Sequence, residues 1–241
     1  MIMTNLFSNT KTVIIGGTSG IGLATAHKLV QNGGEVVIAG RSEEKLQFAL
    51  RKLGRGATGK SIDITDFGSL PVFFSEIGEF DHLVITSTQT LFKPFTELSS
   101  NEIFTMVNTK LLGSLFAAQA AIKQIKPNGS ILFFGGVVGH KALKNGSIVA
   151  LINSGLEGLT RSLALELAPL RINLIAPGIA DTGRWDHLTL ENKQKAKTSA
   201  GSSLPVQRVG ELGDFTDALL MMLKNTFMTG SVVRIDGGGQ L

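Results

Sequence analysis

Seven consecutive residues, Gly16 to Gly22, have the composition of a turn that binds phosphate groups. They read Gly-Gly-Thr-Ser-Gly-Ile-Gly, follow the β-branched run 12–15 and open a stretch with apolar residues at helical spacing. Glycine lets the backbone turn sharply and approach a ligand, and a helix start offers unpaired N–H groups. A glycine-rich turn without a ligand is the alternative. The residues expected to bind a pyrophosphate are Gly16, Thr18, Ser19, Gly20, Ile21 and Gly22.

A cation follows the second β-branched run, where a dinucleotide-binding fold contacts the adenosine ribose. An acidic residue at this point would bind the ribose 2′-hydroxyl, whereas the sequence here is Gly40-Arg41-Ser42. Gly40 cannot repel a 2′-phosphate, and the Arg41 guanidinium can bind one with two hydrogen bonds. Arg41 and Ser42 therefore favour NADP(H) over NAD(H). The alternative is that Arg41 is an ordinary surface cation near a helix start.

With these features the chain resembles the short-chain dehydrogenase/reductase family over nearly its whole length. The spacing of Gly16, Gly20 and Gly22 matches the family's glycine motif, and segment 157–168 is similar to the helix that follows the family's active site. The resemblance implies an oxidoreductase lineage that uses a nicotinamide dinucleotide. It also implies that Asp63 lies beside the adenine and that the adjacent Ile64 binds the cofactor. Contacts to the nicotinamide are implied for Pro177, Gly178, Ile179 and Thr182.

The same resemblance locates the catalytic positions, and there the match fails. Members of the family use a tyrosine as proton donor, a lysine that binds the nicotinamide ribose, and a serine that holds the substrate oxygen. Those positions fall on Val149, Asn153 and Gly136, and the chain contains no tyrosine. Asn108 matches the remaining member of the catalytic tetrad. The amide of Asn153 is expected to keep a hydrogen bond to the ribose.

Two functions therefore stay open. One is an oxidoreductase of altered mechanism, whose carbonyl–alcohol chemistry is absent or strongly impaired and for which an activated alkene or iminium would be an easier substrate. The other is a non-enzymatic NADP(H)-binding sensor or partner subunit. His140, Lys141 and Lys144 follow the fifth expected strand and are candidates for a replacement acid. The alternative for each of them is a solvent-facing loop residue.

Short β-branched runs alternate with amphipathic stretches, which is typical of a parallel sheet covered by helices. The expected fold is α/β: a single-domain Rossmann fold over residues 1–241, with a doubly wound, parallel, seven-stranded sheet and helices on both faces. Long helices are expected at 101–125 and 146–168. Segment 181–207 is expected to be a lid with a short helix, and its lysine run 193–197 a solvated helix face. Strands are expected at 12–15, 35–39, 60–64, 82–85, 130–134, 172–175 and 231–235.

Composition excludes several other classes. The chain has no cysteine, and its His, Asp and Glu residues do not cluster at ligand spacing, so no metal site is expected. The net charge of +4 is scattered, which argues against nucleic acid as a partner. No apolar run is long enough to cross a membrane, and a cytoplasmic protein is expected. The family resemblance implies a homodimer or homotetramer formed through the two long helices.

Overall fold

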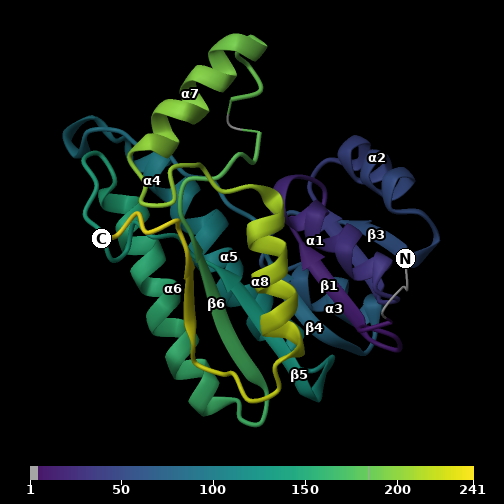
Figure 1. The fold of residues 1–241 in the computed structure, drawn as a ribbon. Helices are drawn as coiled ribbons and strands as arrows, with labels where there is room; N and C mark the ends of the chain where they lie inside the picture. The colour runs from purple at the N-terminus through teal and green to yellow at the C-terminus, as the bar shows by residue number, and fades with distance from the viewer. Residues whose placement is uncertain (1–4, 184) are drawn as a thin grey trace.

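A seven-stranded parallel sheet forms the centre of the computed structural model, which describes residues 5–183 and 185–241 (Figure 1). The strand order is β3-β2-β1-β4-β5-β6-β7, and every neighbouring pair is parallel. The expected doubly wound sheet is confirmed. The strands are β1 (Lys11–Ile15), β2 (Glu35–Gly40), β3 (Ala57–Ser61), β4 (Phe80–Ile85), β5 (Ile125–Phe134), β6 (Arg171–Pro177) and β7 (Val232–Ile235).

Helices cover both faces of the sheet. Because side chains alternate along a strand, Ile14 of β1 packs with one layer of helices while Val13 and Ile15 pack with the other. The first layer consists of α1 (Gly20–Gln31), α2 (Glu43–Leu53) and α8 (Leu212–Lys224). The second consists of α3 (Leu70–Ile77), α4 (Ser100–Met106), α5 (Gly113–Ala121) and α6 (Ser147–Glu166).

The prediction of a single helix over 101–125 is wrong, because a π-helical turn, η3 (Val107–Leu112), separates α4 from α5. At the end of this turn the N–H of Gly113 donates to the carbonyl of Asn108, five residues earlier, so the helix is locally widened. The strand that follows begins earlier than expected, since Ile125 already pairs with β4 ahead of a register shift. Apolar periodicity alone does not reveal an inserted residue of this kind.

The two ends of the expected lid, segment 181–207, lie next to each other. Ala180 and Gly210 form an isolated parallel bridge, with the N–H of Gly210 donating to the carbonyl of Ile179 at 2.9 Å. Between them lies α7 (Leu190–Ser202), which projects away from the body of the molecule (Figure 1). Arg184, within the expected lid, lies outside the described residues.

The lysine run in α7 is not simply solvated, contrary to expectation. Lys197 lies 2.9 Å and Lys193 lies 3.8 Å from the carboxylate of Asp181, and Lys193 also donates to Asp186 at 2.6 Å. The hydrogen bond from Lys197 holds the pKa of Asp181 below its usual value. These pairs join α7 to the residues where the segment leaves the sheet. Each pair joins a lysine of α7 to an aspartate in the loop that precedes this helix.

The strand order reverses between β1 and β4, which lie next to each other at the centre of the sheet. In open parallel sheets this reversal leaves a crevice at the carboxyl ends of the strands, where ligands bind. None of the helices in the described part of the chain is long and apolar enough to cross a membrane.

Candidate active site

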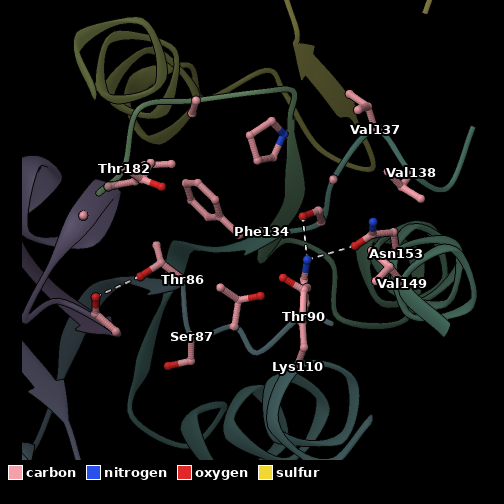
Figure 2. Close-up of a pocket in the computed structure, with 18 of the residues that line it drawn as sticks. Thr86, Ser87, Thr90, Lys110, Phe134, Val137, Val138, Val149, Asn153 and Thr182 are labelled. Atoms are coloured by element: carbon pink, nitrogen blue, oxygen red, sulfur yellow. Dashed lines mark hydrogen bonds between the residues drawn. The ribbon is translucent and has the colours of Figure 1, made fainter. Parts of the chain in front are cut away.

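A cavity of about 1160 Å³ opens at the carboxyl ends of the strands (Figure 2). Its volume exceeds the usual range of about 300–1,000 Å³ for small-ligand pockets, so an extended ligand has room. Two residues expected at the site, Asp63 and Asn108, are not part of its described lining. The expected residues that do line it are Gly16, Thr18, Ser19, Gly20, Ile21, Gly22, Arg41, Ser42, Ile64, Gly136, Val149, Asn153, Pro177, Gly178, Ile179 and Thr182.

The glycine-rich turn has the geometry of a ligand cradle. A Cβ atom at Gly22 would lie 2.3 Å from the carbonyl oxygen of Gly16, so only glycine lets the turn and α1 come this close. Gly20 has a φ of +52°, and the nearest atom to an added Cβ is the carbonyl oxygen of Thr182 at 3.9 Å, which leaves the space in front of it open. Ser19 makes no side-chain cap, so the first N–H groups of α1 are available to an anion.

Thr86, at the end of β4, ties this turn to the neighbouring strand. Its hydroxyl donates to the carbonyls of Ile15 at 3.3 Å and Gly16 at 3.1 Å. A Cβ atom at Gly22 would also lie 2.6 Å from this hydroxyl. Thr86 was not among the expected site residues, because its role depends on a contact between β1 and β4 that only the fold reveals.

Two cations stand at the end of β2. Arg41 and Lys45 are exposed and line the cavity, and Ser42 caps α2 by accepting a hydrogen bond from the N–H of Lys45 at 3.3 Å. Among the described residues of the lining, Asp236 alone is acidic. This end of the cavity is therefore suited to an anionic group. Asp63 lies nearby in sequence to the lining residue Ile64, but its carboxylate accepts hydrogen bonds from the N–H and hydroxyl of Thr65.

The segment after β6 crosses the cavity above the start of α1. Gly178 is held close to β7, since a Cβ atom there would lie 2.7 Å from Cα of Asp236. Thr182 is exposed and lies on the side of the cavity opposite Asn153 (Figure 2). Pro177 and Ile179 complete this wall. The segment thus faces the glycine-rich turn across a space that a ligand can enter.

Gly136, Val149 and Asn153 come together on the wall formed by β5 and α6. Val149 and Asn153 are one helical turn apart, and their side chains are 4% and 1% exposed. A Cβ atom at Gly136 would lie 2.9 Å from Nδ2 of Asn153, so the amide occupies the space beside the glycine. Among the described lining residues, this part of the wall offers an amide and apolar surface but no hydroxyl.

A residue that the sequence analysis did not single out provides the charge at this wall. Lys110 extends from η3, is 5% exposed, and lines the cavity. Its Nζ donates to the carbonyl of Gly135 at 2.7 Å and to Oδ1 of Asn153 at 2.9 Å (Figure 2). Burial lowers the pKa of Lys110 to about 8. The sequence signal was a single cation inside an apolar stretch, two residues after Asn108.

The three expected replacement acids occupy different surroundings. His140 is not part of the described lining; its Nε2 lies 2.5 Å from the carboxylate of the buried Glu157, and Arg234 contacts its ring. Lys141 lines the cavity but donates to the carbonyl of Gly239 at 2.6 Å. Lys144 lines the cavity and is exposed. His140 is therefore engaged outside the cavity and is not placed to serve as the acid.

The donor set fits a nicotinamide dinucleotide better than a metal ion. The glycine cradle and the cations at the end of β2 suit phosphate groups, and the wall around Val149 is apolar enough for an aromatic ring. No group of three or more His, Asp or Glu side chains that could hold a metal occurs in the described residues.

Comparison with known proteins agrees with this geometry. A family model described as enoyl-(acyl carrier protein) reductase matches residues 16–240. Carbonyl reductase family member 4 of Danio rerio is 31% identical over 237 residues, covering 95% of this chain and 97% of the relative. A short-chain dehydrogenase/reductase of Gibberella fujikuroi is 30% identical over 259 residues, covering 96% and 94%. A crystal structure of a small-chain dehydrogenase in complex with NADPH is 32% identical, with a TM-score of 0.82 and coverage of 96% and 98%. The chain belongs to the short-chain dehydrogenase/reductase family.

Proposed function

We propose that this protein binds NADP(H) in preference to NAD(H) and is an oxidoreductase of altered mechanism. The observation that carries the proposal is the cavity itself, which has a glycine cradle and two cations at one end and a buried cation at the other. A family relative of known structure contains NADPH. Arg41 and Lys45 are the residues proposed to hold the 2′-phosphate, and the N–H groups at the start of α1 are proposed to hold the pyrophosphate.

Ordinary carbonyl–alcohol chemistry is proposed to be strongly impaired. Val149, Asn153 and Gly136, at the positions matched to the family's tyrosine, lysine and serine, provide neither a phenol nor a hydroxyl. Loss of a general acid lowers rates by about 10²–10⁴-fold, whereas positioning of two reactants can still contribute roughly 7–11 kcal/mol. Slow reduction of an activated acceptor, such as an electron-poor alkene, an iminium or a dicarbonyl, is therefore the proposed chemistry.

Calorimetric titration with NADPH and NADH tests the cofactor assignment. Tighter binding of NADPH, by about tenfold or more, is the expected result. Turnover is then measured by the loss of NADPH absorbance against simple ketones, dicarbonyls, enones and imines. Slow oxidation with the activated acceptors and little with simple ketones is expected. Rapid reduction of a simple ketone would contradict the proposed mechanism, and failure to bind either dinucleotide would contradict the proposal as a whole.

A second candidate is a non-enzymatic NADP(H)-binding sensor or partner subunit. The observation that favours it is Val149, whose buried apolar side chain lies on the wall where the family places its proton donor. The two candidates differ in one measurement: a sensor binds NADPH with no oxidation by any acceptor in the panel. An enzyme of altered mechanism oxidises it with at least one.

Self-association is proposed through the helices of the second layer. Phe104 on α4 and Leu151 on α6 are 62% and 55% exposed, and these two helices contact each other, so the two side chains are proposed to belong to one apolar surface. Light scattering of the purified protein tests this, with a dimer or tetramer expected. Phe104→Glu and Leu151→Glu should shift the mass toward the monomer, and a monomeric wild-type protein would contradict the proposal.

A further inference from the structure

The Lys110 ammonium is the one buried cation that reaches the cavity wall among the described residues. Lys141 and Lys144 also line the cavity, yet both are exposed. Transfer of an ammonium from water to the protein interior is costly unless its hydrogens find acceptors. Two of the three Nζ hydrogens of Lys110 have acceptors, the carbonyl of Gly135 and Oδ1 of Asn153. The third has no acceptor within the part of the chain that the structure describes.

The backbone around Lys110 is arranged to present this group. Lys110 lies in the π-helical turn η3, between α4 and α5, and this turn is in contact with α6. Figure 2 shows the side chain directed toward Asn153 and the end of β5. π-Helical turns occur mostly as local insertions and are frequent at functional sites, because they reposition a side chain without ending the helix.

We propose that Lys110 is a catalytic residue, whose ammonium donates its third hydrogen to an oxygen atom of the ligand at the end of the cavity opposite Arg41. The proposal rests on the proposed function, since it concerns the reacting end of the same cavity. Two oxygens share the required chemistry: a hydroxyl of the sugar next to the nicotinamide, and the oxygen of a bound acceptor. A binding experiment tests the sugar hydroxyl, and a rate measurement tests the acceptor oxygen.

The neighbouring residues agree with this assignment. Asn153 provides an acceptor for Lys110, whereas a lysine at that position would place a second ammonium within about 3 Å of the same site, where like charges repel strongly. Val149 leaves no competing acid on that side of α6. Burial also makes Lys110 a better acid than an exposed lysine, because its pKa falls to about 8.

The proton transfer is balanced when the acceptor is a carbonyl compound. The reduced dinucleotide, when bound, supplies a hydride and thereby the two electrons. One N–H bond of the Lys110 ammonium breaks and an O–H bond forms on the acceptor oxygen. The neutral amine that remains is held by Asn153 and Gly135 and regains a proton from water once the alcohol has left. Because pH 7 is below the pKa of Lys110, which is about 8, Lys110 is protonated at the start of the reaction.

The first arm compares NADPH with 2′,5′-ADP, which has the phosphate end of the dinucleotide but lacks the nicotinamide and its ribose. Dissociation constants are measured for the wild type, Lys110→Met and Lys110→Arg, with Lys123→Met as a matched control because Lys123 is exposed. If Lys110 contacts the sugar, Lys110→Met weakens the binding of NADPH about tenfold or more and leaves the dissociation constant of 2′,5′-ADP unchanged. Lys110→Arg, which keeps the positive charge and the hydrogen-bond donors, weakens the binding of NADPH less than Lys110→Met does.

The second arm measures single-turnover oxidation of NADPH by 9,10-phenanthrenequinone at pH 7. If Lys110 contacts the acceptor, Lys110→Met lowers the rate by about 10²–10⁴-fold. Lys110→Arg lowers it similarly, because a guanidinium does not release its proton in this pH range. Unchanged NADPH affinity relative to 2′,5′-ADP together with an unchanged rate in Lys110→Met overturns the proposal. If the wild type shows no oxidation, the first arm decides alone.

A measurement on the wild type covers the case in which the variants fail to fold. The ¹⁵N resonance of the Lys110 side chain is followed during addition of NADP⁺, alone and with the quinone. Movement of this resonance, without movement of the bulk lysine signal, is expected, and no movement in either titration overturns the proposal. A wild type that binds neither NADPH nor 2′,5′-ADP instead rejects the proposed function, so the two failures are distinguishable.

Discussion

The Nζ of Lys110 lies 2.9 Å from Oδ1 of Asn153, and this hydrogen bond joins the π-helical turn η3 to α6 at the wall of the cavity. Both side chains are buried. The bond connects two parts of the chain more than 40 residues apart, and each partner satisfies the polar group of the other. Substitution of either one is therefore expected to affect the other, which can be measured as a coupling energy.

Asn153→Lys is expected to destabilise the fold strongly. It removes the acceptor of Lys110 and buries a second ammonium beside the first, at a cost of about 3–5 kcal/mol. The double variant Lys110→Met/Asn153→Lys should recover much of this loss, because one charge is gone. Urea unfolding of the four proteins in the cycle measures the coupling. Ser162→Lys is the control, since Ser162 is exposed on the same helix and should show no coupling with Lys110→Met. Additive effects at positions 110 and 153 would contradict the prediction.

Stability at alkaline pH should report on Lys110. Burial lowers the pKa of Lys110 from 10.5 to about 8, so between these values the unfolded chain binds the proton and the folded protein does not. Stability contributed by this group therefore rises with pH from about 8 to 10.5, by on the order of 3 kcal/mol relative to Lys110→Met. Parallel urea unfolding of both proteins across this range gives the difference. A pH-independent difference would mean that Lys110 titrates normally.

Acid sensitivity should depend on His82, which is buried on β4 and hydrogen-bonded through Nδ1 to the hydroxyl of Ser130 at 2.9 Å. Burial, with a contribution from the nearby Arg171, lowers the pKa of His82 from 6.5 to about 4. The unfolded chain therefore binds this proton first as pH falls, and stability is lost between about 6.5 and 4, by on the order of 3 kcal/mol.

His82→Gln should remove this part of the acid sensitivity, because glutamine can keep a hydrogen bond to Ser130 and does not titrate. The test is the difference in unfolding free energy between wild type and variant at pH 7 and pH 4.5. The wild type is expected to lose more. His27→Gln, at an exposed histidine of α1, serves as the matched control. Equal losses in wild type and His82→Gln would show that His82 is protonated in the folded protein.

Arg41→Asp should reverse the choice of dinucleotide. Loss of a charge-assisted hydrogen bond and addition of a repelling carboxylate should weaken NADPH by about 10–100-fold, while NADH gains an acceptor for its 2′-hydroxyl. Calorimetric titration with each dinucleotide gives the ratio. Arg51→Asp makes the same charge change at an exposed position in the last turn of α2 and should leave the ratio unchanged. An unaltered ratio in Arg41→Asp would remove Arg41 from the site.

Local patterns were sufficient for most of the fold and for the glycine-rich end of the cavity. The run 12–15 and the glycine-rich turn each carry their signal within a few residues, and the structure has a strand and a turn into α1 at these places. The cavity also includes Arg41 as expected. These features depend on backbone geometry and short-range hydrogen bonds, which the local sequence specifies.

The opposite end of the cavity could not be derived in this way. Lys110 becomes a site residue because a π-helical turn widens the helix and because Asn153, far along the chain, lies opposite. Neither condition leaves a local pattern. His140, chosen for its position in the chain, is drawn away by Glu157 on α6 and Arg234 on β7. Contacts of this kind, between segments that are distant in the chain, depend on the packed structure.

The close approach of Gly136 to the Asn153 amide constrains the order in which this site can evolve. A serine at 136 has its Cβ atom 2.9 Å from Nδ2 of Asn153, so the amide must be displaced before the hydroxyl can be accommodated. A lysine at 153 in turn meets the cation already present at 110. Both substitutions are therefore expected to require a compensating change, at Asn153 for a serine at 136 and at Lys110 for a lysine at 153.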